Sequence, residues 1–222
     1  MIVINKLRQL VNSKKLVIFD LDGVIADSEG AKFAAYCDVF RRYFDLELDF
    51  ADNSWRGKAE TEVMNYFISK SSINSMISIT ELIREKRRAY EALLENVSPI
   101  TGVVQFVTRL AASGKLLSVA TSSPRAHTSI ILDRFEIKHL FHSIVTSEDV
   151  LHIKPAPDVY VATLVNLKTN AEDAVVFEDT PTGAQAAKAA GIRVIPVLTS
   201  YRSSDFTDCT LVIKDFEKIF ND

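Results

Sequence analysis

The sequence predicts an α/β fold in which a parallel sheet carries helices on both faces and a small all-helical domain follows the first strand. Six apolar runs rich in β-branched residues have strand length, at 16–19, 116–120, 144–146, 174–177, 192–197 and 210–213. The runs are continuous instead of alternating, which is typical of strands covered on both faces. Segments with helical spacing separate several of them, and this order favours a parallel sheet.

The helices of the predicted sheet domain have recognisable faces. The segment 103–110 places four apolar side chains on one helical face, and Gly114 after it accepts the left-handed conformation that often ends a helix. Alanines at positions 184, 187 and 190 form a second face made of small residues. We expect that helix to lie close to the sheet, because small side chains permit a close approach.

Residues 30–95 have a different character, because they contain no strand-like run and two amphipathic stretches. One apolar stripe runs from Phe33 to Phe44 and the other from Leu82 to Val97, both at helical spacing. The simplest interpretation of their aromatic residues is the core of a helical domain. We therefore predict one domain formed by 1–29 and 96–222 and a helical domain formed by 30–95.

Composition excludes several classes of partner. The net charge of −3 and the pI near 5.9 argue against nucleic acid or an anionic membrane surface, since both attract a basic face. No run has the length of a membrane span or of a signal-peptide core. Cys37 and Cys209 are far apart and indicate neither a disulfide framework nor a zinc site. We expect a cytoplasmic protein, and the sequence leaves its oligomeric state open.

The segment KLVIFDLDGVIADS brings Asp20 and Asp22 to the end of the first predicted strand, before a turn at Gly23. In an open parallel sheet, ligands bind at the edge formed by the carboxyl ends of the strands. A capped turn explains the pair equally well in isolation, because an Asp-x-Asp-Gly string occurs by chance in roughly one chain of this length in twenty.

Three further predicted strand ends carry polar side chains, namely Thr121 with Ser122, Lys154 within HIKPAPDVY, and Glu178 with Asp179. Taken singly, the hydroxyls and acids are compatible with helix capping and the lysine with a solvated charge. Taken together, four segments with complementary chemistry end at the same edge of the predicted sheet. Their combination predicts a functional site.

Crowded carboxylates at this edge require a cation. Asp20, Asp22, Glu178 and Asp179 would repel one another, and their pKa values would rise unless a positive charge neutralised them. Ligands that offer only oxygen favour Mg²⁺ over zinc or copper, and the four histidines show no metal-binding spacing. The sequence therefore predicts a magnesium site.

These four segments resemble the motifs of haloacid dehalogenase-like hydrolases, in particular the branch that contains β-phosphoglucomutase and many sugar phosphatases. The resemblance covers residues 16–29 and 97–222. It implies a Rossmann-like catalytic core and identifies 30–95 as a cap domain. It also implies that Asp20 attacks phosphorus, and that Asp22 protonates the leaving alkoxide and later deprotonates water. Dehalogenases of the family lack this second aspartate, so their chemistry is excluded.

The resemblance implies roles for the remaining motif residues as well. Thr121, with Ser122 beside it, would bind a phosphate oxygen, and Lys154 would neutralise the nucleophile and the phosphoryl charge. The implied Mg²⁺ ligands are Asp20, the backbone carbonyl of Asp22, Glu178 and Asp179. A carboxylate is a weak nucleophile, so the metal and the lysine must stabilise charge on the transferring phosphoryl group.

The expected function is that of a magnesium-dependent phosphatase acting on a small phosphorylated metabolite, with sugar phosphates as a family-level expectation. β-Phosphoglucomutases carry a histidine at the position matching Lys32 and an arginine near the position matching Glu60, and neither is present. This difference favours transfer to water, while a phosphosugar mutase and a non-catalytic phosphate-binding protein remain alternatives. Arg56 and Lys58 are candidates for binding a second anionic group, or simply a solvated helix entrance.

Overall fold

The computed structural model describes residues 2–52, 55–56, 58–71 and 76–219, which divide into two compact units. The core unit comprises Met1–Asp27 and Ser98–Asp222, and the helical unit comprises Ser28–Val97. Two short antiparallel strands, β2 (Ala26–Asp27) and β3 (Ser98–Pro99), pair where the chain leaves and re-enters the core unit. Both connections to the helical unit therefore start from one place.

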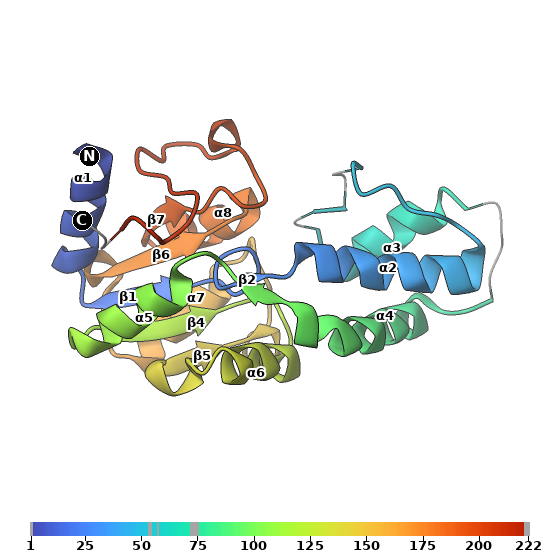
Figure 1. Cartoon of the computed structure of the whole chain (residues 1–222), viewed down its shortest axis with the longest axis horizontal. Helices are drawn as coiled ribbons and strands as arrows, with labels where there is room; N and C mark the ends of the chain where they lie inside the picture. The colour runs from blue at the N-terminus through green and yellow to red at the C-terminus, as the bar shows by residue number, and fades with distance from the viewer. Residues whose placement is uncertain (1, 53–54, 57, 72–75, 220–222) are drawn as a thin grey trace. The chain divides into compact units, whose positions relative to one another are not determined.

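A five-stranded parallel sheet forms the centre of the core unit, in the order β5, β4, β1, β6, β7 (Figure 1). Its strands are β1 (Leu16–Phe19), β4 (Leu116–Ala120), β5 (Ser143–Val145), β6 (Ala174–Glu178) and β7 (Arg193–Pro196). The predicted parallel sheet is confirmed. The first strand in the chain lies at its centre, flanked by β4 and β6.

The prediction of a sixth strand at 210–213 is wrong. Within this run only Ile213 forms a bridge, with Val197 just beyond β7. Its backbone N–H donates to Pro196 O, and its carbonyl accepts from Leu198 N. Thr210 is exposed and the other three residues of the run are only half-buried, so the run lacks the burial of the central strands.

Helices and apolar side chains cover both faces of the sheet, as the sequence predicts. On one face, α7 (Asp158–Asn166) and α8 (Pro181–Ala189) pack against Leu16, Ile18 and Val176. On the other face, Phe106 of α5 (Val103–Ala112) makes edge contacts with Phe19 at 6.0 Å and Phe177 at 5.4 Å between ring centroids. Burial on both faces explains why the strand sequences are continuously apolar.

Two more α-helices belong to the core unit, α1 (Ile2–Ser13) and α6 (Arg125–Arg134). The prediction contained no helix before the first strand, although Leu7 and Val11 of α1 lie one turn apart and are both buried. Single 3₁₀ turns occupy Leu94–Asn96, Lys138–Leu140, Ser147–Asp149, Ala171–Asp173 and Ser203–Asp205. No helix in the described ranges combines the length and apolar character needed to cross a bilayer.

Among its described residues, the helical unit contains three α-helices, α2 (Glu29–Phe44), α3 (Glu60–Ile68) and α4 (Ile79–Leu93). The apolar stripes predicted on α2 and α4 face a common core with Phe67 of α3, whose ring lies 5.4 Å from that of Phe40. The hydroxyl of Ser78 accepts a hydrogen bond from Glu81 N and caps α4. The sequence pattern does not predict α3, because the buried face of this helix has only three residues, Val63, Met64 and Phe67.

Candidate active site

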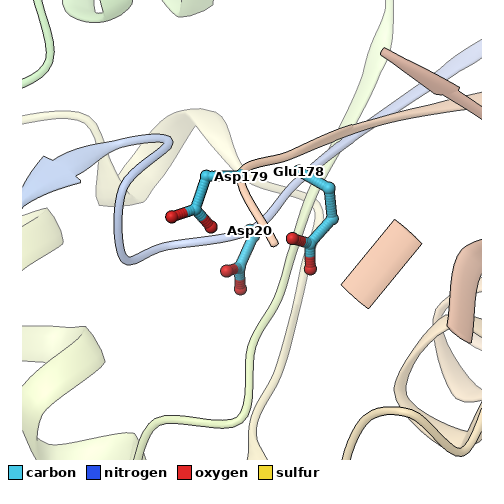
Figure 2. Close-up of side chains that lie close together, drawn as sticks. All are labelled: Asp20, Glu178 and Asp179. Carbon is cyan, nitrogen blue, oxygen red and sulfur yellow. The ribbon is translucent and has the colours of Figure 1, made fainter. Parts of the chain in front are cut away.

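Three acidic side chains meet where the chain leaves β1 and β6 (Figure 2). Asp20 directly follows β1, Glu178 ends β6 and Asp179 comes next. All three are buried, and each offers a carboxylate oxygen within 4.8 Å of the others'. Because β1 and β6 are adjacent and parallel, their carboxyl ends bring residues distant in sequence to one point.

A buried lysine lies against this cluster. Lys154, in the loop before α7, donates from Nζ to Asp20 Oδ1 at 2.9 Å, to Glu178 Oε1 at 2.5 Å and to the Ala120 carbonyl at 3.0 Å. Three acceptors account for the three protons of the ammonium group. The Lys154 side chain is only 7 % exposed, so these contacts replace nearly all of its hydration.

By count, acidic groups are in excess in this cluster, because three carboxyl groups accompany the one ammonium group of Lys154. Burial raises the pKa of Asp20 to about 7, and Glu178 and Asp22 add to the rise against the attraction of Lys154. Burial alone would lower the pKa of Lys154, but Asp20 and Glu178 outweigh it and hold this pKa well above its usual value. A divalent cation among the carboxylates would relieve the excess and favour their ionised forms.

Glu178 is held on both of its oxygens. Its Oε1 accepts from Lys154 and, at 3.0 Å, from the Tyr160 hydroxyl, while its Oε2 accepts from the backbone N–H and the hydroxyl of Thr180, each at 3.1 Å. A Cβ at Gly183 would lie 1.8 Å from Oε1, so only glycine leaves room for the carboxylate. Burial and the charge of Glu178 raise the pKa of Tyr160 well above 10, and the hydroxyl therefore keeps its proton.

Asp179 is positioned by a loop and a glycine. The Ser200 hydroxyl donates to Asp179 Oδ2 at 2.5 Å. Gly23 has a φ of +73°, and a Cβ there would lie 2.0 Å from the same oxygen. The turn after Asp22 therefore needs glycine both for its backbone conformation and for its close approach to Asp179.

Asp22 and the hydroxyl-rich turn after β4 are connected. The Ser123 hydroxyl donates to Asp22 Oδ2 at 2.5 Å, and the Ser123 N–H donates to Thr121 Oγ1 at 3.0 Å. Thr121 is buried, whereas Ser122 is exposed. The sequence predicts no role for Tyr160 or Ser200, and for Ser123 it predicts only a hydroxyl-rich turn compatible with helix capping. Tyr160 lies within the HIKPAPDVY segment, so the sequence already carried a signal for it, whereas nothing pointed to Ser200.

The two predicted cap cations, Arg56 and Lys58, belong to the helical unit and have partners there. Arg56 Nε forms an ion pair with Glu29 Oε2 at 3.1 Å, and its guanidinium lies 5.2 Å from the ring centroid of Phe50. Lys58 Nζ lies 5.5 Å from the ring centroid of Tyr66. These contacts lie within the helical unit, and a role of the two cations in binding a second anionic group stays a prediction.

The donor set of the acidic cluster fits a magnesium ion. Among the described residues, the one group of three or more side chains with metal-ligand geometry consists of Asp20, Glu178 and Asp179, which offer only carboxylate oxygens. Hard cations prefer such ligands, and a bound cation would oppose the burial that is the main cause of the raised pKa of Asp20.

Comparison with known proteins points to one family. The model of the family described as "Haloacid dehalogenase-like hydrolase" matches residues 17–197. A "Phosphorylated carbohydrates phosphatase" of Thermotoga maritima is 31 % identical, over 81 % of this chain and 82 % of that protein. A "Beta-phosphoglucomutase" of Bacillus subtilis is 28 % identical, over 82 % and 83 %. CbbY from Rhodobacter sphaeroides, solved in complex with phosphate, has a TM-score of 0.84 at 23 % identity, with coverage of 93 % and 96 %.

Proposed function

The chain belongs to the haloacid dehalogenase-like hydrolase family, and from that premise we propose that it is a Mg²⁺-dependent phosphatase of small phosphate monoesters, with sugar phosphates as the favoured class. The relative that is named for phosphorylated carbohydrates supports the substrate class. The observation that carries the proposal is the contact between the buried Lys154 ammonium and Asp20. A carboxylate that is deeply buried, held by a lysine and surrounded by other carboxylates has the setting of a nucleophile that needs a counter-charge.

In the proposed mechanism, Asp20 attacks the phosphorus atom of the substrate. The bond from phosphorus to the ester oxygen breaks, and an aspartyl phosphate forms on Asp20. Lys154 already donates to Asp20 and stays within reach of the phosphoryl oxygens as charge develops on them. Thr121 and Ser122, at the end of β4, would donate to the same phosphoryl group.

A magnesium ion would be held by Asp20, the backbone carbonyl of Asp22, Glu178 and Asp179. When bound, it supplies positive charge that neutralises these carboxylates and the phosphoryl oxygens. Gly23 and Ser200 keep Asp179 in place for this role through the contacts described above.

Asp22 would serve as general acid and base. It gives a proton to the leaving alkoxide, and in the second step it takes a proton from the water that attacks the phosphoenzyme. Such assistance contributes about 10²–10⁴-fold in rate. The Ser123 hydroxyl, 2.5 Å from Asp22 Oδ2, holds this carboxylate at the site.

A phosphosugar mutase is the second candidate, because one of the relatives is named β-phosphoglucomutase. In a mutase the aspartyl phosphate must pass to a sugar phosphate and not to water. Glu60, where those mutases have an arginine nearby, forms ion pairs with Lys86 at 3.1 Å and Arg87 at 2.6 Å. The two cations are therefore engaged by a carboxylate, which supports the phosphatase over an enzyme that must bind a second phosphate.

A panel of phosphate esters incubated with Mg²⁺ tests the proposal. We expect release of inorganic phosphate, fastest from sugar phosphates and abolished by chelation of the metal. Isomerisation of a hexose 1-phosphate that depends on a bisphosphate primer and releases no phosphate would assign the protein as a mutase. Failure of every donor in the panel would leave only a phosphate-binding role. We also propose a cytoplasmic location, in keeping with two free cysteines.

A further inference from the structure

Tyr160 touches both the anion and the cation at the centre of the candidate site. It projects from α7 and is completely buried. Its hydroxyl donates to Glu178 Oε1 at 3.0 Å, and the same oxygen accepts from Lys154 Nζ at 2.5 Å. Lys154 Nζ also lies 5.0 Å from the centroid of the tyrosine ring. A single side chain therefore contacts Glu178 through its polar end and Lys154 through its face.

The hydroxyl completes a set of donors that prevents Glu178 from turning. Two hydrogen bonds from Thr180 hold Oε2, and the bonds from Tyr160 and Lys154 hold Oε1. Four donors from three residues therefore restrain the orientation of this carboxylate. Without the Tyr160 hydroxyl, Oε1 would lose one of its two donors among these four and retain Lys154. The carboxylate could then rotate and draw the ammonium away from Asp20.

We propose that Tyr160 is a positioning residue, whose hydroxyl fixes Glu178 so that this carboxylate holds the Lys154 ammonium against Asp20. This inference rests on the proposed phosphatase function and deepens it. Tyr160 contacts Glu178 through its hydroxyl and Lys154 through its ring, so its effect on the reaction passes through these two residues. Its removal should therefore slow the chemical step and leave substrate binding almost unchanged.

The test compares Tyr160→Phe with Thr163→Val in the full-length protein. Thr163 lies on the same helix, is also fully buried, and donates its hydroxyl to Val159 O at 2.8 Å, away from the cluster. Both substitutions remove one buried hydroxyl. We expect Tyr160→Phe to lower kcat about tenfold with KM within about twofold of wild type, and Thr163→Val to keep both constants within about twofold. Direct binding of orthovanadate, measured by calorimetry, should weaken with Tyr160→Phe in proportion to kcat.

A double-mutant cycle with Glu178→Gln tests the route of the effect. Because Tyr160 acts through Glu178, adding Tyr160→Phe to Glu178→Gln should change kcat by less than about twofold. Independent, multiplying effects would overturn the inference, as would a kcat of Tyr160→Phe within twofold of wild type. If Tyr160→Phe does not fold, Thr180→Val removes the hydroxyl on the other oxygen of Glu178, with the same expected and overturning results. Wild-type protein that releases no phosphate would overturn the proposed function itself.

Discussion

The core unit and the helical unit each bury a lysine above a tyrosine ring, and the two lysines are in opposite electrostatic situations. Lys154 and Lys86 are 7 % and 6 % exposed, and they lie 5.0 Å from the ring centroid of Tyr160 and 4.8 Å from that of Tyr36. In the core unit, one cation is shared by Asp20 and Glu178, with Asp179 close by. In the helical unit, two cations, Lys86 and Arg87, share the single carboxylate of Glu60.

The pKa directions follow this difference in charge balance. Burial by itself would raise the pKa of Glu60, but Lys86 and Arg87 outweigh it and lower this pKa below its usual value. Burial raises the pKa of Asp20 to about 7 in spite of Lys154. In the helical cluster the carboxylate of Glu60 is paired with two cations, and a structural role is the best explanation of this cluster. The core cluster has three carboxyl groups and one ammonium group, and this excess of acids distinguishes a candidate active site from an ordinary buried ion pair.

The largest effect should come from removing the nucleophile. Asp20→Asn cannot form an aspartyl phosphate, and we expect phosphate release to fall at least about 10⁴-fold. Asp173→Asn is the matched control, because Asp173 pairs with the exposed Lys15 and lies outside the cluster. Its rate should equal that of wild type. Near-normal turnover by Asp20→Asn would disprove the nucleophile assignment.

The next largest effects should come from substituting the two buried lysines. The loss in the free energy of unfolding should differ between the two clusters. Lys154→Met leaves two buried carboxylates without their cation, at a cost of about 3–5 kcal/mol in the free energy of unfolding without metal. Lys86→Met leaves Glu60 paired with Arg87, and we expect a loss of about 1 kcal/mol. Denaturant unfolding in EDTA measures both. Equal losses would show that charge balance does not distinguish the two sites.

Magnesium should stabilise the protein through the core unit alone. At about 100 times its Kd, Mg²⁺ should add about 2.7 kcal/mol to the free energy of unfolding. Asp179→Asn should lose most of this increment, whereas Glu60→Gln should retain it. Thermal unfolding with and without Mg²⁺ provides the measurement. A wild-type Tm that does not respond to Mg²⁺ would contradict the assignment of the metal site.

The smallest effect concerns pH in metal-free buffer. The carboxyl group of Asp20 has a pKa of about 7 in the folded protein, against a reference value of 3.8. Between these values the folded state binds more protons than the unfolded state, so the contribution of this group to stability falls as pH rises from about 4 to about 7. The Asp20→Asn protein lacks this carboxyl group, so its free energy of unfolding should decline less than that of wild type between pH 5 and pH 8 in EDTA. If the free energy of unfolding changes equally with pH in the two proteins, the raised pKa of Asp20 is refuted.

Local patterns in the sequence were sufficient for the five strands of the parallel sheet and for the motif residues near their ends. Asp20 and Lys154 are 134 positions apart, yet both could be assigned to one edge of the sheet, because parallel strands all end on the same side. The family resemblance added roles for these residues, which stay proposals. The strand expected at 210–213 failed because pairing depends on a neighbour that the run itself does not specify.

The sequence by itself determined the α/β class, the apolar strands and the chemistry available at their ends, since period and composition are local properties of the chain. Only the tertiary structure decided which charges share a buried environment. It brought the Tyr160 hydroxyl to Glu178 and placed two cations, Lys86 and Arg87, against Glu60. The physical reason is that electrostatic balance depends on distances and burial, and neither quantity is a property of a short stretch of sequence.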